Sequence, residues 1–370
     1  MRSGVRGLIG LNLRSPGHRS FPQIRVTRFR GAPWLRWGLL VDYIRLTRTL
    51  LDQDYDYDDL RRLQRGGELF RVRRGAYARE DNHDQLVEER HRRLVLGTAP
   101  QLRDGAVLSH GSAAVLHGLP VWPVAVARVH VTRHRRGNGV QRSIVHVHGA
   151  LLPPLDITLI DNMPVTSLRR TVLDLARTLP MMWAVAAGDR ALALGLTSQE
   201  LAAGLLAMER WPGVRAARRA VEFLDVRSES PGESVSRVRL VEKGLPRPEP
   251  QREIFGPDGR VIARVDFYWE EHKTVGEFDG KIKYGRLLKR GHRIEDVIFD
   301  EKVREDAVRD LGLQVVRWIL ERPPSRWRTS GTGAPSLCAG FLMPLRINWL
   351  DLASPADDAK PEQSMRSGVG

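Results

Sequence analysis

Two carboxylates near the end of the chain have the spacing of a metal site, Asp266 in segment 264–269 (RVDFYW) and Glu277 in segment 274–279 (TVGEFD). If residues 270–273 form the turn of a β-hairpin, Trp269 pairs with Thr274 and Asp266 lies directly opposite Glu277. Like charges at such positions, with Cβ atoms roughly 5 Å apart, destabilise a sheet unless something neutralises them. A divalent cation held by both carboxylates would do so, and the pattern therefore predicts a metal site.

Period-two alternation along the two strands predicts which side chains share a face. The apolar residues of the first strand fall on one face, with Asp266 on the other: Val265, Phe267 and Trp269. The charged residues of the second strand share a side: Glu277, Asp279 and Lys281. The alternative is that these carboxylates are solvated and form ion pairs with nearby arginines, since surface ion pairs are common and contribute little to stability. The grouping of the acids on one side favours the metal site.

Phosphodiester hydrolysis is the chemistry that such a site would support, because carboxylate-held magnesium or manganese activates water and neutralises phosphate charge. Asp266 and Glu277 would hold the metal, and Glu233 could add a third carboxylate. Lys281 or Lys302 could polarise water or steady the leaving phosphate. Arg264, Arg304 and the basic run after Gly280 would bind the nucleic-acid backbone.

Two of these assignments have a structural alternative. Glu233 stands three residues after Ser230 and two after Pro231, which is the pattern of a helix N-cap, a first-turn proline and a capping-box glutamate. The segment from Lys302 to Asp306 has a helical i,i+4 charge pattern that would also suit a solvated face.

Composition supports a nucleic-acid partner. The 370 residues carry a formal net charge of +15, much of it from arginine, which favours bidentate phosphate contacts. We expect DNA as the first candidate, with an anionic membrane surface as the weaker one. The sequence has no apolar run long enough to span a membrane. A single cysteine, Cys338, excludes an intramolecular disulfide framework and is typical of a reducing cytoplasm.

The elements that must position the acidic pair form an α/β (α+β) order at the C-terminal end. The sequence predicts a helix to Lys243, a strand over 251–255, a turn at Gly256–Gly259, the acidic hairpin, a helix over 297–311 and a buried strand over 313–319. Helix, three strands, helix and strand make an α/β/α sandwich, which we place at residues 226–322. Residues 323–370 are expected to be a poorly ordered tail.

The preceding chain divides into three parts. Residues 1–41 contain eight arginines and no acid, and we expect a disordered basic extension. Residues 42–80 indicate a small winged helix, whose wing would carry Arg71, Arg73 and Arg74 against backbone phosphates; an exposed basic hairpin without a partner is the alternative. Residues 81–225 predict a mixed α/β middle domain.

Two features of the middle domain are interpreted as structural. The arginine-rich helix over 86–96 reads as a solvated face with i,i+4 pairs. Five histidines could suggest a metal cluster, but no carboxylate or thiol accompanies them at ligand spacing, which favours core or surface histidines. They are His110, His117, His130, His146 and His148.

The segment from about Ser230 to Trp318 resembles the restriction-endonuclease-like superfamily, whose signature is Asp, a spacer, then Asp or Glu, any residue, and Lys. It is closer to a bacterial family of domains related to very-short-patch-repair endonucleases, on the elements 265–267, 276–280, 302–306 and 311–318. The likeness covers about a quarter of the chain and implies a metal-dependent nuclease fold. The usual lysine two places after the Glu is Asp279 here; the repair endonucleases also lack it, and Lys281 offers the motif shifted by two.

The winged segment, with residues 109–114 and 164–171, resembles the antitoxin component of abortive-infection type IV toxin-antitoxin systems. That resemblance implies DNA binding, repression of its own operon and a cognate toxin as partner. The sequence thus leaves a magnesium-dependent DNA nuclease, an antitoxin-like regulator with an inactive nuclease-fold domain, and an RNA-directed enzyme that would use the same residues.

Overall fold

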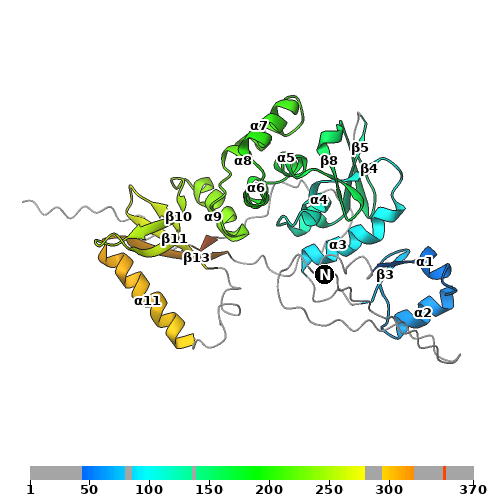
Figure 1. Cartoon of the computed structure of the whole chain (residues 1–370), viewed down its shortest axis with the longest axis horizontal. Helices are drawn as coiled ribbons and strands as arrows, with labels where there is room; N and C mark the ends of the chain where they lie inside the picture. The colour runs from blue at the N-terminus through cyan, green and yellow to red at the C-terminus, as the bar shows by residue number, and fades with distance from the viewer. Residues whose placement is uncertain (1–43, 80–85, 136–138, 280–293, 321–344, 347–370) are drawn as a thin grey trace, which may run out of the picture. The chain divides into compact units, whose positions relative to one another are not determined.

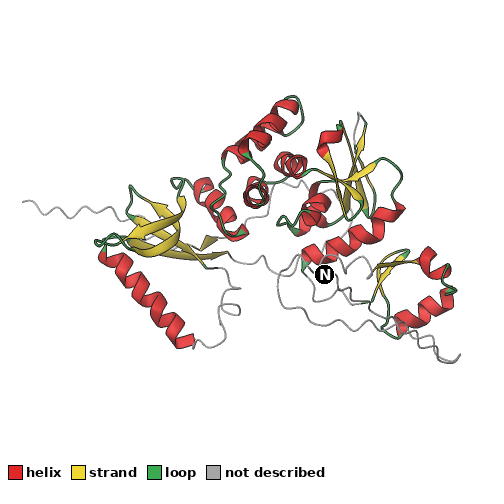
Figure 2. Cartoon of the chain, viewed as in Figure 1, coloured by secondary structure: helices red, strands yellow, loops and turns green. Residues whose placement is uncertain are grey.

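The computed structural model describes residues 44–79, 86–135, 139–279, 294–320 and 345–346 (Figure 1). These belong to the second of two compact units, Tyr43–Gly370. They form three sheets with helices packed beside them, and the α/β fold class expected from the sequence is confirmed (Figure 2). The expected basic extension and most of the expected tail lie outside the described residues. Among the described helices, none combines the length and apolar character that a membrane span requires.

The first sheet has three short antiparallel strands in the order β1-β3-β2, namely β1 (Ile44–Leu46), β3 (Ala76–Ala78) and β2 (Phe70–Arg73). Between β1 and β2 lie α1 (Thr47–Leu51) and α2 (Tyr57–Arg65). Asp56 and Asp59 form a reciprocal capping box at the start of α2, which ends at Gly66. Gly75 turns the β2–β3 hairpin with φ +84°, a conformation that favours glycine. The hairpin expected from the sequence is therefore present.

The second sheet has six strands in the order β6-β7-β5-β4-β9-β8. Two neighbouring pairs, β5–β7 and β4–β9, are parallel and the others are antiparallel. The strands are β4 (Ala106–Leu108), β5 (Val129–His134), β6 (Val140–Gln141), β7 (Val145–Ala150), β8 (Ile157–Ile160) and β9 (Met163–Thr166). The helices around it are α3 (Val87–Thr98), α4 (His110–Leu116), α5 (Leu168–Thr178), α6 (Met181–Ala193), α7 (Ser198–Ala207) and α8 (Val214–Glu222), with 3-10 turns at Ala99–Gln101, Pro123–Val126 and Pro154–Asp156.

Helix α3 corrects one expectation. Its His91, Arg92 and Arg93 are buried rather than solvated, because α3 packs against the first sheet as well as against α4 and β5. Arg92 reaches Asp161 at 2.8 Å, and the i,i+4 pair of Arg93 with Glu89 is present at 3.5 Å. A helix whose charge pattern is typical of a solvent-facing surface can thus be buried, because its charged side chains pair with residues from distant segments.

The third sheet follows α9 (Pro231–Glu242) and has the order β10-β11-β12-β13-β14. Its strands are β10 (Glu249–Phe255), β11 (Val261–Trp269), β12 (Thr274–Phe278), β13 (Gln314–Leu320) and β14 (Leu345–Arg346), and α11 (Ile294–Asp310) lies between β12 and β13. Strand β13 runs parallel to β12, and the other pairs are antiparallel. The expected hairpin register is confirmed, because Trp269 pairs with Thr274 across the turn at residues 270–273.

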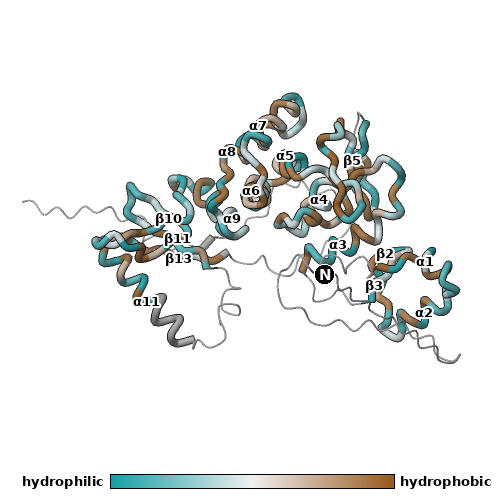
Figure 3. The backbone as a smooth tube through the Cα atoms, in the orientation of Figure 1, coloured by the Kyte–Doolittle hydropathy of each residue, from teal (hydrophilic) through white to brown (hydrophobic). Residues whose placement is uncertain are grey.

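Both faces of the third sheet are covered by apolar contacts, and Figure 3 shows hydrophobic residues gathered along its strands. Leu240 of α9 packs with Phe267 on one face, and Val308 of α11 packs with Val265 on the other. The expected alternation is therefore wrong at one point, since Val265 and Phe267 belong to opposite faces. The change of face falls at Asp266.

Helix α9 also belongs to the core of the preceding helices. Val235 and Val238 lie in the same apolar cluster as residues of α5 and α6. Arg237 is fully buried and donates to Asp189 of α6 at 2.6 Å. The helix that begins the expected last domain is thus shared by two cores.

Candidate functional site

Asp266 lies where the β11–β12 ladder ends. The paired residues run from Trp269–Thr274 to Phe267–Gly276, and the next step would place Asp266 opposite Glu277. Instead of continuing the ladder, the Asp266 carboxylate accepts the backbone N–H of Phe278 through Oδ2 at 2.8 Å. A side chain therefore replaces a backbone acceptor at this point, which fixes the carboxylate beside the end of β12.

Gln251 of β10 links Asp266 to Glu233 of α9. Its Nε2 donates to Asp266 Oδ1 at 3.2 Å and to Glu233 Oε2 at 2.9 Å. Gln251 has φ +56°, which is uncommon for a residue other than glycine and is found preferentially at functional sites. The backbone of β10 is thus held in an unfavourable conformation at the residue that joins the two acids.

Glu233 is buried, and its carboxylate accepts three hydrogen bonds, one of them from Gln251. Oε1 accepts the hydroxyl of Ser230 at 2.7 Å, and Oε2 also accepts the N–H of Glu229 at 3.0 Å. Ser230 is the N-cap and Pro231 the first residue of α9, as the sequence predicted. Burial raises the pKa of Glu233, and the negative charge of Asp266 adds to the increase against the lowering effect of these hydrogen bonds. The side chain of Glu233 therefore has two roles: it caps α9, and it is linked to Asp266 through the amide of Gln251.

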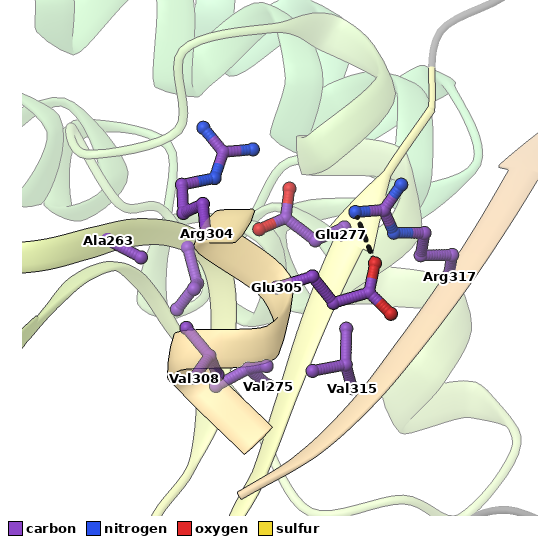
Figure 4. Close-up of a pocket in the computed structure, with 9 residues that line it drawn as sticks. Ala263, Val275, Glu277, Arg304, Glu305, Val308, Val315 and Arg317 are labelled. Carbon is purple, nitrogen blue, oxygen red and sulfur yellow. Dashed lines mark ion pairs between the residues drawn. The ribbon is translucent and has the colours of Figure 1, made fainter. Parts of the chain in front are cut away.

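Glu277 faces the α11 side of the sheet. It lines a small pocket with Val275 and Val308, in the company of Arg304, Glu305 and Arg317 (Figure 4). Glu305 and Arg317 form an ion pair at 2.9 Å in this pocket. Glu277 is accordingly placed among charged groups of α11 and β13, whereas Glu233 lies on α9, which packs against the opposite face.

The three acids are not gathered into a ready cluster. Over the described ranges, Asp266, Glu277 and Glu233 form no group whose carboxylate oxygens all lie within 4.8 Å of one another. The physical reason is the two-sided sheet, which brings Glu233 to Asp266 through Gln251 and leaves Glu277 facing α11. Asp279 is half-buried, and its N–H donates to the carbonyl of Trp318 at 2.9 Å. Lys302 is exposed on α11, and Lys281 lies outside the described residues.

Asp266 nevertheless retains the capacity to bind a cation. Each of its two oxygens accepts one hydrogen bond, and an ionised carboxylate offers about four lone-pair sites. Oxygen donors of this kind suit magnesium or manganese. Asp266 thus offers oxygen donors to a hard divalent cation, whereas Glu277 lies with the charged groups of α11 and β13.

The arginines expected to bind nucleic acid differ in availability. Arg71 and Arg74 are exposed on the β2–β3 hairpin, whereas Arg73 is half-buried and burial lowers its pKa. Arg264 forms an exposed ion pair with Glu229 at 2.6 Å. Arg304 is exposed at the rim of the Glu277 pocket. Arg71, Arg74 and Arg304 can therefore meet a phosphate most directly.

A second cluster was not expected from the sequence. His110, His130 and His148 each offer a ring nitrogen, and these three atoms lie within 4.8 Å of one another. The parallel pairing of β5 with β7 brings His130 and His148 together, and β4 delivers His110 from the other side. The sequence signal was the spacing of His146 and His148, which places both side chains on one strand face. Its meaning depended on a strand pairing that spacing alone does not reveal.

No family model matches the chain. Two curated relatives from Mycobacterium tuberculosis, "Uncharacterized protein Rv2248" (strain ATCC 25618 / H37Rv) and "Uncharacterized protein MT2308" (strain CDC 1551 / Oshkosh), are each 30% identical over 149 residues. The match covers 36% of this chain and 55% of each relative, so the chain spans about half of their length. Among solved structures, the crystal structure of RV2827C protein from Mycobacterium tuberculosis has a TM-score of 0.33 at 14% identity, covering 62% of this chain and 90% of that one. We draw no functional conclusion from these similarities.

Proposed function

We propose that this protein binds DNA and hydrolyses its phosphodiester bonds with a magnesium- or manganese-dependent site in the segment from α9 to β13. The observation that carries the proposal is the Gln251 bridge between Glu233 and Asp266, beside the backbone of Phe278 and hence next to Glu277. A buried acid, a strained glutamine and a strand-end aspartate are held together at this point. Such an arrangement costs stability, and sites of this kind are concentrated where function requires them.

The element order supports the same proposal. Helix α9, the antiparallel strands β10, β11 and β12, helix α11 and the parallel strand β13 follow one another as in the restriction-endonuclease-like architecture that the motifs resemble. Asp266 lies at the end of the β11–β12 ladder, where a substrate phosphate can approach without competing for strand hydrogen bonds.

The residues have distinct roles in the proposed reaction. Asp266 would hold the cation, joined by Glu277 once that side chain turns from the α11 side of the sheet, and the bound cation would supply an activated water and charge neutralisation at the phosphate. Glu233 is a positioning residue, because its hydrogen bond to Gln251 orients the amide that orients Asp266. Arg304, at the rim of the pocket, offers its guanidinium to a substrate phosphate.

A cleavage assay tests the proposal. Supercoiled DNA, linear DNA and single-stranded RNA are incubated with the full chain and magnesium, manganese or chelator. We expect metal-dependent DNA cleavage that Asp266→Asn or Glu277→Gln reduces by at least about 100-fold while DNA affinity is kept. Glu253→Gln, an exposed acid on β10, is the matched control and should cleave like the wild type. Cleavage by both site variants at the wild-type rate, or cleavage in chelator, would refute the assignment.

A second function is favoured by one specific observation. Asp279 stands where the motif usually has lysine, and Glu277 shares its pocket with Arg304 and the Glu305–Arg317 ion pair rather than with Asp266 or Glu233. An antitoxin-like regulator, with an inactive nuclease-fold domain and a cognate toxin as partner, would have such a site. Tight binding to DNA of its own operon, without cleavage of DNA or RNA under any metal condition, would support this function over the nuclease.

A further inference from the structure

A three-histidine cluster lies in the second sheet, away from the acidic residues of the third. His130 Nδ1 and His148 Nε2 are 3.0 Å apart, and the rings of His110 and His148 are stacked with centroids 3.7 Å apart. The three candidate nitrogens all lie within 4.8 Å of one another. Nitrogens that share a tetrahedral zinc ion are separated by roughly 3.3 Å, given a Zn–N distance of about 2.0–2.1 Å. The cluster therefore requires only small adjustments to hold such an ion.

The surroundings of His110 select one of its ring nitrogens. Its Nδ1 is 3.0 Å from the hydroxyl of Ser109, which in turn accepts the hydroxyl of Thr132 at 2.9 Å. Histidine ligands in metal sites usually have their second nitrogen held in this way, which fixes the ring and its tautomer. Nε2 of His110 is then the nitrogen left for a ligand bond.

The backbone at His110 supports a role beyond packing. His110 is buried and has φ +50° at the start of α4, directly after the β-strand that pairs with β5. This conformation is energetically unfavourable for a residue other than glycine. The ring of His110 is stacked on His148, and a ligand bond would offset the cost of the backbone conformation.

We infer that His110, His130 and His148 form a binding site for a transition-metal dication that prefers imidazole ligands, zinc in the first place. Three histidines leave a fourth position for water or a further ligand, as in three-histidine zinc sites. His146 stacks on His148 with centroids 4.0 Å apart and lies outside the group of three candidate ligands. Imidazole ligands select zinc over magnesium, so this site and the proposed carboxylate site would take different metals.

Nearby positive charge limits the affinity. Arg128, Arg170 and Arg177 are close enough to act on the cluster, and all three disfavour a positive charge there. Arg177 Nε and Nη1 have no hydrogen-bond partner within the described part of the chain. An anionic fourth ligand such as hydroxide would offset part of this positive charge. We therefore expect weaker zinc binding than in thiolate sites.

The test measures metal binding directly. The full chain is stripped with chelator and titrated with zinc against a chromogenic chelator, and with cobalt by visible absorption. We expect one equivalent of metal and a cobalt spectrum of a four- or five-coordinate nitrogen site. His110→Gln, His130→Gln and His148→Gln should each weaken zinc binding by at least about 10-fold. Zinc should also raise the melting temperature of the wild type and not of these variants.

Matched controls separate this site from other causes of loss. His117→Gln replaces a partly buried histidine that bonds the carbonyl of Thr166 outside the cluster, and His272→Gln replaces an exposed one in the β11–β12 turn. Both should bind zinc like the wild type, and far-UV circular dichroism should show that every variant is folded. Asp266→Asn should also retain zinc, which makes this test independent of the nuclease site. Binding of less than a tenth of an equivalent, or unchanged binding in the cluster variants, would overturn the inference.

Discussion

Gln251 shows how a single residue can serve the proposed site at a cost to the fold. Its amide joins Glu233 to Asp266, and its φ of +56° places a non-glycine residue in the left-handed region. Natural chains retain such conformations where surrounding contacts and function compensate for them. The hydrogen bonds and the backbone strain at this residue can be separated by mutation.

We predict that Gln251→Gly will be more stable than Gln251→Ala by about 1 kcal/mol, because glycine adopts positive φ without a Cβ penalty. Both variants lose the amide, so both should lose most of the cleavage activity. Urea denaturation followed by circular dichroism gives the difference in the free energy of unfolding. Equal stability of the two variants would mean that residue 251 is not strained in solution.

At the scale of elements, the expected segments largely correspond to those observed. Gly-Pro-Asp-Gly at residues 256–259 turns β10 into β11, and Gly244 and Gly312 follow α9 and α11 with positive φ, because turn and cap chemistry is local. The register of Asp266 and Glu277 followed from the length of the hairpin turn. The separate surroundings of the two side chains did not, because they depend on which strand face is turned toward α9 or α11. The histidine cluster was missed for the same reason, since it depends on the parallel pairing of β5 with β7.

Helix α3 shows how distant packing overrides a local pattern. Its charge spacing suits a solvated face, yet His91 is buried and its Nε2 lies 2.9 Å from the hydroxyl of Ser112. Burial lowers the pKa of His91 to about 4, against a smaller raising effect of the Val126 backbone. Between pH 6.5 and about 4, His91 is therefore protonated in the unfolded chain and neutral in the folded chain. The stabilisation is complete above pH 6.5 and is lost as the pH falls toward 4.

We predict that His91→Gln, which keeps a polar partner for Ser112, will weaken this pH dependence. Between pH 7.5 and about 4.5 the variant should lose roughly 2–3 kcal/mol less unfolding free energy than the wild type. Urea titrations at the two pH values measure the loss. His272→Gln, an exposed substitution, should follow the wild type. Parallel losses in wild type and His91→Gln would show that His91 charges freely in the folded protein.

At the scale of the whole molecule, a net charge of +15 governs association with a polyanion. Each phosphate that a lysine or arginine neutralises releases condensed counterions, so affinity falls with salt. The exposed Arg71 and Arg74 of the β2–β3 hairpin are placed for such contacts.

We predict that DNA affinity will fall roughly 100-fold between about 50 and 200 mM salt, as about four phosphate contacts would require. Arg71→Ala with Arg74→Ala should reduce the slope of log affinity against log salt by about 2, one for each contact. Fluorescence anisotropy with labelled duplex DNA measures both. Arg260→Ala, an exposed arginine in the β10–β11 turn, is the control for charge alone. A salt-insensitive affinity would remove net charge as an argument for a nucleic-acid partner.

Helix α9 packs against two different apolar cores, and the spacing of its residues fixes which side chains face each core. Val235, Arg237 and Val238 are packed toward the preceding helices, while Leu240 is packed toward the third sheet. One residue inserted between Val238 and Leu240 would turn everything beyond it by about 100° around the helix axis. Either Leu240 would leave its cluster or Arg237 would leave Asp189. We therefore expect insertions to be tolerated at places such as the turn at residues 256–259 and not within α9, whose length fixes how its two packed faces are oriented.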